Sequence, residues 1–314
     1  MKSRMTIIAV STWLVLVAEA SCLSAAEPTR VLNGHAFMPS EVVRAPFALS
    51  HFSTRTGGGI AFGLKTPFID VDGEDLGTLE GDVGFMTLGF EYQQRFGSWF
   101  AGRASFRGSA RIGIDEQSIL AQGVNGAYVF SFGGTGRILQ SEKVILSGAL
   151  DFSNSQLIGV DPFGFATSVI EDGLEADNDL VATSDFYNTK LGVLVGWAPM
   201  GWLGLTGVLE GGRGKVSLDD ANVSIGGGAT VGVDFKSLNL IPIGIQLLGK
   251  TDAFSSAGAD LSDRTWAYGL GISYTGWDDF SLSMETTMNV LERRGQEDEF
   301  EAFLVTFNLY FWPH

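Results

Sequence analysis

"SWFAGRASFRGSARIG", residues 98–113, carries three arginines spaced four residues apart, with small and apolar residues between them. As a strand, its even positions hold Phe100, Phe106 and Ile112 and its odd positions hold the arginines and serines, so apolar and polar side chains separate at a period of two. As a helix, like charges at i and i+4 would repel and two interior glycines would each cost about 1 kcal/mol. The stretch therefore predicts a β-strand with one charged side.

The same alternation recurs along the chain, for example at residues 85–93, 191–197 and 303–311. About twelve strands are predicted, near residues 56–69, 82–96, 99–113, 119–138, 143–154, 187–198, 202–214, 224–236, 239–250, 264–276, 279–291 and 300–311. No repeat or low-complexity linker divides them. One all-β domain is therefore expected over residues 51–314.

The first clear hairpin joins residues 82–96 to 99–113. Phe96, Gly97 and Ser98 read as a three-residue turn, with the glycine available for the left-handed position. If Arg95 pairs with Trp99, Arg103 falls opposite Glu91 on the polar face.

The N-terminus has the features of a secretory signal. Lys2 and Arg4 precede an apolar run over residues 5–17, and the small residues of "LSAAE" offer a cleavage site near residue 26. Cys22 raises the alternative of lipid attachment, but Glu19 stands where such a signal prefers an apolar residue. We expect residues 1–26 to be a signal peptide and residues 27–50 a separate N-terminal periplasmic segment, whose packing the sequence does not assign.

Charge and cysteine content exclude several classes of function. The chain has a net charge of −16, and loss of the signal with Lys2, Arg4 and Glu19 changes this to −17 and removes the single cysteine. Nucleic acid is not an expected partner, because its phosphates require a basic footprint. A disulfide framework is not expected either.

Alternation alone fits a soluble extracellular sandwich as well as a membrane barrel. The predicted connections favour the barrel, because tight turns such as 96–98 and 198–201 alternate with longer loops such as 155–186, apart from a short link at 114–118. Short periplasmic turns and longer extracellular loops produce this rhythm. The six tryptophans after the signal also lie at strand ends, which is typical of aromatic girdles at the two bilayer surfaces: Trp99, Trp197, Trp202, Trp266, Trp277 and Trp312.

With its signal, its alternating strands and a last strand reading "FLVTFNLYF" (303–311), the chain resembles a Gram-negative outer-membrane β-barrel protein. The resemblance implies outer-membrane lipid as the surroundings and recognition of the C-terminal strand by the outer-membrane insertion machinery. The chain departs from the pattern because residues 312–314 follow the terminal aromatic Phe311. The resemblance names a class and no particular transporter.

If the apolar side faces lipid, the charged side faces the barrel interior, since an arginine at the bilayer midplane costs roughly 2–4 kcal/mol. The predicted lumen-lining residues are Glu91, Arg103, Arg107, Arg111, Asp151, Lys190, Glu210, Asp234, Lys250 and Glu285. They predict an outer-membrane channel that passes small solutes through a narrow polar lumen. The alternative is a closed barrel, plugged by paired charges, with a structural or surface-interaction role carried by its acidic loops.

Other chemistry has little support in the sequence. The acidic loop 155–186 contains no Lys or Arg. It is interpreted as a solvated loop, with a constriction of the lumen or a cation-binding surface as alternatives. The three histidines, His35, His51 and His314, show no nucleophile–base spacing, so no enzyme activity is predicted. No zinc, haem or phosphate-loop motif is present, and no cofactor or metal is predicted.

Overall fold

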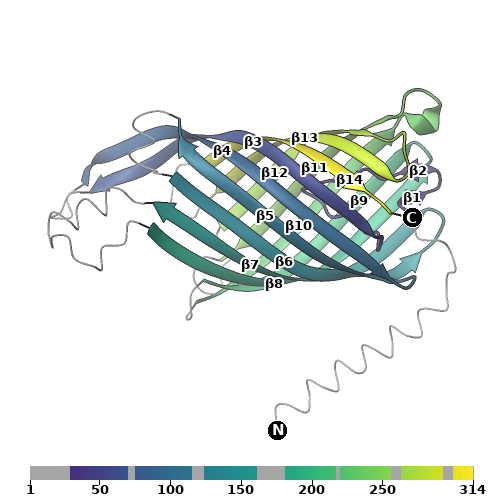
Figure 1. The fold of residues 1–314 in the computed structure, drawn as a ribbon, viewed down its shortest axis with the longest axis horizontal. Coiled ribbons are helices and arrows are strands. Elements are labelled where there is room, and N and C mark those ends of the chain that lie inside the picture. Colours follow the sequence, from purple (N-terminus) through teal and green to yellow (C-terminus); the bar gives the residue numbers. More distant parts are fainter. Residues whose placement is uncertain are drawn as a thin grey trace, which may run out of the picture.

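The computed structural model describes residues 29–69, 75–114, 124–160, 181–216, 220–255, 263–292 and 300–313. Twelve of its strands form one closed barrel, in which each strand pairs antiparallel with its neighbours in sequence and β14 pairs with β3 (Figure 1). The barrel strands are β3 (His51–Ile69), β4 (Asp75–Phe96), β5 (Phe100–Gly113), β6 (Val124–Gln140), β7 (Val144–Val160), β8 (Val181–Met200), β9 (Leu203–Val216), β10 (Asp220–Asp234), β11 (Ile243–Phe254), β12 (Asp263–Tyr274), β13 (Phe280–Glu292) and β14 (Phe300–Phe311). The predicted all-β fold, a single transmembrane barrel of about twelve strands, is confirmed.

The two faces of the barrel wall differ as the alternation predicts. Val193 and Val195 in β8 are exposed on the outer face, whereas Leu194 between them points inward and is buried. Met86 in β4 exposes 70% of its surface in the same outward direction. A closed ladder leaves no unpaired edge in the bilayer, and the outward apolar side chains meet lipid.

Several strands are longer than the sequence predicts. β3 begins at residue 51 rather than 56 and β4 at 75 rather than 82, while β7 and β8 take residues from the predicted loop 155–186. Main-chain pairing continues past the stretches that alternate clearly: residues 51–55 contain one large apolar residue, Phe52, and residues 75–81 have Leu76 and Leu79 at a spacing that does not fit a strand. Residues 161–180 of that loop, and the predicted strand start at 119–123, lie outside the described residues.

The predicted strand 239–250 begins too early. The chain instead forms a 3₁₀-helix, η1 (Lys236–Leu238), and Asn239 adopts the left-handed conformation with φ of 56°. Pro242 follows, which lacks the N–H that a paired strand position needs, and β11 starts only at Ile243. The turn after β10 is therefore longer than the predicted two residues.

The register of the β4–β5 hairpin also differs from the prediction. Phe96 pairs with Phe100 around Gly97, whose φ is 71°. This turn places Gln93, rather than Glu91, opposite Arg103. Placing the turn one residue later shifts the partner of Arg103 by two positions and keeps both charges on the inner face.

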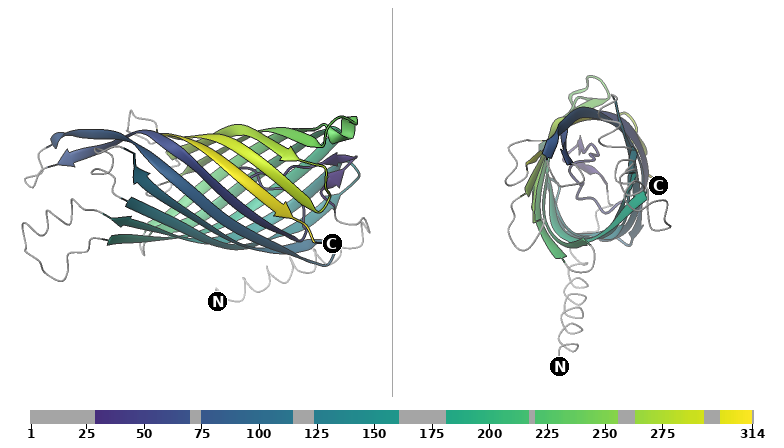
Figure 2. Two further views of the ribbon diagram at one scale, coloured as in Figure 1. Left: turned by 45° about the horizontal axis from the view of Figure 1, so that its top comes forward. Right: turned by 90° about the vertical axis from the view of Figure 1, so that its left-hand side faces the viewer.

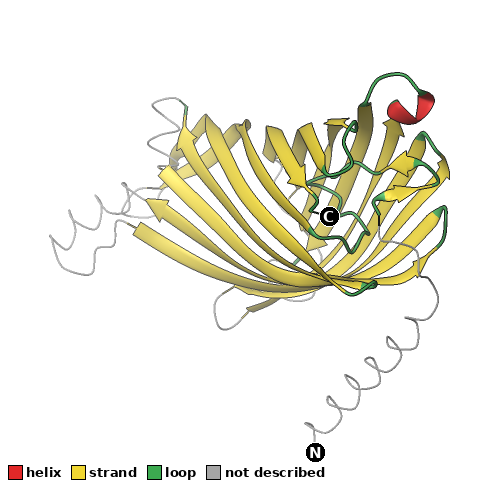
Figure 3. Cartoon of the chain, turned by 45° about the vertical axis from the view of Figure 1, so that its right-hand side comes forward, coloured by secondary structure: helices red, strands yellow, loops and turns green. Residues whose placement is uncertain are grey.

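The N-terminal segment lies inside one end of the barrel, and residues 29–50 are called the plug below. A small hairpin, β1 (Val31–Leu32) and β2 (His35–Ala36), sits at the end that holds the tight turns, and the chain then runs through the interior to β3 (Figures 2 and 3). The side-chain amide of Asn33 donates hydrogen bonds to the carbonyls of Ala198 and Pro199, at the end of β8, at 3.1 and 3.2 Å. The hairpin is thereby held at the end of the barrel that has the tight turns.

The plug supplies half of the residues in the two buried apolar clusters. Phe37 and Phe47 pack with Ile145 in one buried cluster, and Val43 packs with Leu194 and Val208 in a second. Inward-facing side chains of the wall also bind its main chain: Gln246 donates to the carbonyl of Pro39 at 3.1 Å, Ser147 to that of Pro46 at 2.6 Å, and Gln93 to that of Leu49 at 2.8 Å. These bonds satisfy backbone groups that the plug, lacking a strand partner, leaves open.

Two of the tryptophans predicted for the girdles are exposed on the outer face at opposite ends of their strands, Trp197 in β8 and Trp266 in β12. Trp312 is different. It stacks on Tyr310 at a ring-centroid distance of 5.7 Å, and the guanidinium of Arg30 in the plug lies 4.2 Å above its ring. Trp312 therefore contacts the plug and belongs to the inner side of the wall.

Candidate functional site

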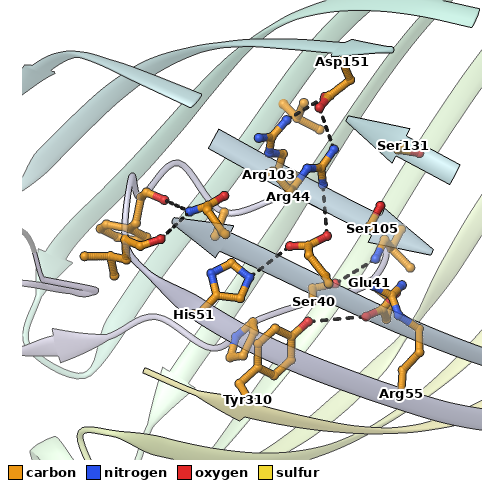
Figure 4. Close-up of a pocket in the computed structure, with 18 of the residues that line it drawn as sticks. Ser40, Glu41, Arg44, His51, Arg55, Arg103, Ser105, Ser131, Asp151 and Tyr310 are labelled. Carbon is orange, nitrogen blue, oxygen red and sulfur yellow. Dashed lines mark hydrogen bonds and ion pairs between the residues drawn. The ribbon is translucent and has the colours of Figure 1, made fainter. Parts of the chain in front are cut away.

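The barrel interior contains a cavity of about 330 Å³ that is bounded on one side by the plug. Figure 4 shows its charged side chains converging from β3, β5, β7 and the plug. Seven of the ten predicted lumen residues line it: Glu91, Arg103, Arg107, Asp151, Lys190, Glu210 and Lys250. The cavity is the candidate site, because it gathers charges from strands that are far apart in sequence.

One group of charges forms a continuous chain along the wall. Arg103 binds Glu91 at 3.2 Å and Asp151 at 2.7 Å, and Asp151 also binds Arg44 of the plug at 2.6 Å. His51 contacts the other oxygen of Glu91 at 3.0 Å. Each carboxylate thus bridges two bases, an arrangement that partly compensates the loss of water around them.

Gly133 makes room for this chain of charges. It pairs with Asp151 in the β6–β7 ladder, and a Cβ atom at this position would lie 2.0 Å from Oδ1 of Asp151. The aspartate side chain can therefore lie flat across the neighbouring strand toward Arg103. Any larger residue would push the carboxylate away from the wall.

A second group lies next to the first, because Lys190 on β8 pairs with Asp151 on β7 in the strand ladder. Lys190 and Lys250 both bind Oε1 of Glu210, at 2.9 and 2.7 Å, and Asp252 approaches Lys250 at 3.4 Å. The two lysines come from strands β8 and β11, which are not neighbours, and Glu210 on β9 joins them. These side chains are only partly buried, so they are accessible to a solute in the cavity.

The three arginines of β5 differ in how far their side chains are exposed. The side chain of Arg103 is 14% exposed, that of Arg107 is 49% exposed, and Arg111 is exposed and does not line the cavity. Arg107 has Glu41 of the plug at 3.7 Å. The series runs from the loop end of the barrel inward and ends at the plug.

Besides Arg111, two more predicted lumen residues have positions outside the cavity. Asp234 accepts hydrogen bonds from the Thr275 hydroxyl at 2.9 Å and from the amide of Lys236 at 3.1 Å, so it holds the turn around η1. Glu285 is fully buried and accepts the amide N–H of Glu41 at 3.2 Å and the hydroxyl of Ser40 at 3.5 Å. Glu285 is therefore an anchor for the plug.

The balance of charge inside the cavity is opposite to that of the whole chain. Among the described residues its lining contains seven cationic and four anionic side chains, whereas the net charge of the chain is −16. Asp252, behind Lys250, adds one further carboxylate next to the lining. A positive interior in an acidic protein raises the local concentration of anions.

Burial lowers the pKa values of two basic groups in the plug. The pKa of Arg44 is lowered to about 10 by burial and by neighbouring Arg103, against the opposing effect of Asp151; it therefore remains charged at neutral pH. Burial lowers the pKa of His35 to about 4, so this imidazole is neutral. His35 lies against Gly204, where a Cβ atom would come within 2.2 Å of the ring.

Sequence reasoning missed the plug residues of the site, Glu41 and Arg44, and the wall residues Arg55 and Tyr310. Strand periodicity gives no information about a segment that fills the lumen without pairing. Tyr310 carried a usable signal, because it lies on the polar side of the last strand with Asn308. Among the described residues, no three His, Cys, Asp or Glu side chains are grouped so that they could hold a metal ion.

No family model matches the sequence, and no curated protein matches it either. Solved structures resemble the fold. An outer-membrane channel from Pseudomonas putida F1 has a TM-score of 0.52 at 10% identity, over 88% of this chain and 99% of that one. The β-domain of the Bordetella autotransporter Brka has a TM-score of 0.50 at 9% identity, over 84% of this chain and 100% of that one. The chain has the fold of the Gram-negative outer-membrane β-barrels.

Proposed function

We propose that the protein is an outer-membrane channel that passes small solutes through a narrow polar lumen. The observation that carries this proposal is the charged cavity of about 330 Å³, whose side chains all come from the inner face of the wall or from the plug. Charges retained in an interior this size line a path for water and ions. The similarity to a Pseudomonas channel supports the fold, and the similar autotransporter domain means that fold by itself does not select the function.

The position of the plug determines whether this channel is open or closed. Its apolar side chains pack against the wall, and wall side chains such as Gln246 and Gln93 hold its main chain. Passage to the periplasm therefore requires the plug to shift or loosen. The resting conductance is expected to be small, with openings that depend on the contacts between plug and wall.

Export and membrane insertion complete the proposal. Residues 1–26 direct the chain out of the cytoplasm, and the last strand, β14, is the segment that the outer-membrane insertion machinery recognises. No catalytic step is assigned to the cavity, in which His51 is engaged by Glu91 at 3.0 Å.

Single-channel recording in planar bilayers tests the proposal. The folded protein is purified in detergent, its folding is verified by heat-modifiable migration on a gel, and current is recorded in KCl on both sides. Discrete current steps are expected. A heat-modifiable protein that gives no steps, including after replacement of Arg44, would instead favour a closed barrel with a structural or surface role.

If the channel conducts, the arginines should set its ion preference. Replacement of Arg103, Arg107 and Arg111 by alanine removes three positive charges from one wall, and the reversal potential in a KCl gradient should move toward cation selectivity. An unchanged reversal potential would place these arginines outside the conducting path. Replacement of Glu142, an exposed residue in the β6–β7 turn, by glutamine is the matched control.

A further inference from the structure

The site where the plug meets the β5 arginines has the composition of a carboxylate receptor. Glu41 of the plug forms an ion pair with Arg55, lies 3.7 Å from Arg107, and accepts a hydrogen bond from the Tyr310 hydroxyl at 3.3 Å. Two guanidiniums and a phenol thus surround one carboxylate, and Figure 4 shows Glu41 with two of these partners, Arg55 and Tyr310. Arginine pairs of this kind recognise carboxylates through directed, charge-assisted hydrogen bonds.

The wall is built so that the two arginines converge. Gly89 stands between Arg55 and Arg107 in the strand ladder, paired with Arg55 on one side and Arg107 on the other. A Cβ atom on Gly89 would lie 2.6 Å from Cδ of Arg55, so the arginine lies flat over the glycine toward Arg107. Two like charges brought together in this way repel unless an anion sits between them.

A further polar group at this site has no partner. Asn308 pairs with Arg55 in the β14–β3 ladder, is 1% exposed, and makes no side-chain hydrogen bond within the described residues. A buried amide without a partner is costly, so the packing around Arg55 is not optimised for stability alone. The amide lies next to Arg55 in the ladder.

We infer that Arg55, Arg107 and Tyr310 form a binding site for small organic carboxylates, and that Glu41 occupies it as an internal substitute for the solute. A carboxylate that enters from the loop end passes Arg111, reaches half-exposed Arg107 and competes with Glu41. Displacement of the Glu41 side chain breaks a link between plug and wall and favours opening. This inference rests on the proposed channel function and names its solute class.

Propionate is the direct probe, because it reproduces the side chain of glutamate beyond Cα. Open probability is measured for the mature chain in bilayers, with KCl replaced by potassium propionate at constant ionic strength on the loop side. Propionate should raise the open probability, and uncharged propionamide at the same concentration should leave it unchanged. Equal responses to both compounds would overturn the carboxylate site.

Variants separate the site from the channel. Arg107→Gln should raise the half-maximal propionate concentration about tenfold or more, since one of two charged partners is lost. Glu41→Gln removes the internal competitor and should raise the open probability before propionate is added. Tyr310→Phe, which removes one hydroxyl only, serves if either charge variant does not fold, and it should weaken the response several-fold, by about one hydrogen bond to a charged group. Glu142→Gln should respond as the unmodified chain does.

A readout that needs no conduction keeps the two ideas distinguishable. The chain without residues 1–26 contains no cysteine, so Val42→Cys introduces a single thiol in the plug. Propionate should accelerate labelling of this thiol by a membrane-impermeant maleimide in folded, detergent-solubilised protein. Accelerated labelling without current steps would refute the channel and retain the site, whereas normal KCl steps with no propionate effect on current or labelling would refute the site alone.

Discussion

Arg103 binds Glu91 at 3.2 Å across the β4–β5 hairpin although Gln93, and not Glu91, is its partner in the strand ladder. The arginine reaches diagonally along the inner face, and its other nitrogen binds Asp151 at 2.7 Å. Long side chains make such diagonal contacts in antiparallel sheets. Charge pairing inside this barrel therefore tolerates the two-residue difference between the predicted and the observed register.

Asp151→Asn should loosen the plug. Asp151 is the shared acid of Arg44 and Arg103, and its loss leaves two positive charges side by side. In a partly wet lumen we expect a loss of about 1–3 kcal/mol in the free energy of unfolding. Urea unfolding, followed by the heat-modifiable band, measures it, with Glu142→Gln as control. A variant as stable as the unmodified chain would show that the pairs contribute no net stability.

Gly133→Ala should disturb the same charges by shape alone. The added methyl group would lie 2.0 Å from the Asp151 carboxylate and 2.4 Å from the carbonyl of Leu150. We expect a loss of about 1–3 kcal/mol. Gly126→Ala in the same strand is the matched control, because its nearest atom would lie 3.8 Å away, an ordinary contact. Similar unfolding midpoints for the two variants would contradict the close approach.

Glu210→Gln should make the channel more selective for anions. Glu210 neutralises Lys190 and Lys250 at 2.9 and 2.7 Å, so its replacement leaves both ammonium groups facing the cavity. The reversal potential in a KCl gradient should move in the direction opposite to that of the arginine variants. A shift in the same direction would mean that the lysines do not face the conducting path.

Acidification should weaken the docking of the plug through His35. Burial lowers the pKa of this imidazole to about 4 in the folded protein, below its ordinary value of 6.5. The unfolded chain therefore binds more protons between these values, and stability falls as the pH drops from about 6.5 to 4, by at most about 3 kcal/mol. Below about pH 4 the contribution is lost and the dependence on pH levels off.

The measurement is the urea midpoint from pH 7 to pH 4, compared with that of His35→Gln. Other groups titrate in this range in both proteins, so the difference between the two curves isolates the imidazole. The unmodified chain should lose more stability on acidification than the variant does. Parallel curves would show that His35 is accessible to protons in the folded state.

The alternation of side chains was sufficient to predict the barrel and the direction of its charges. Because lipid and lumen lie on opposite faces of one wall, a period of two must persist wherever a strand crosses the membrane. That condition identified twelve strands and placed Arg103, Arg107 and Asp151 on the same face. Strand ends such as residues 51–55 and 75–81 were not predicted, because they contain too few apolar side chains at a period of two.

The site itself depends on contacts that no local pattern encodes. Residues 29–50 form no barrel strand, so only the folded structure shows that Glu41 and Arg44 enter the lumen and bind Arg55 and Asp151. The closing pair of strands, β14 and β3, brings Tyr310 to the same place from the other end of the chain. The sequence by itself determined which side chains face inward, because that follows from a local period, and the tertiary structure decided which of them meet, because that follows from barrel closure and from the segment the barrel encloses.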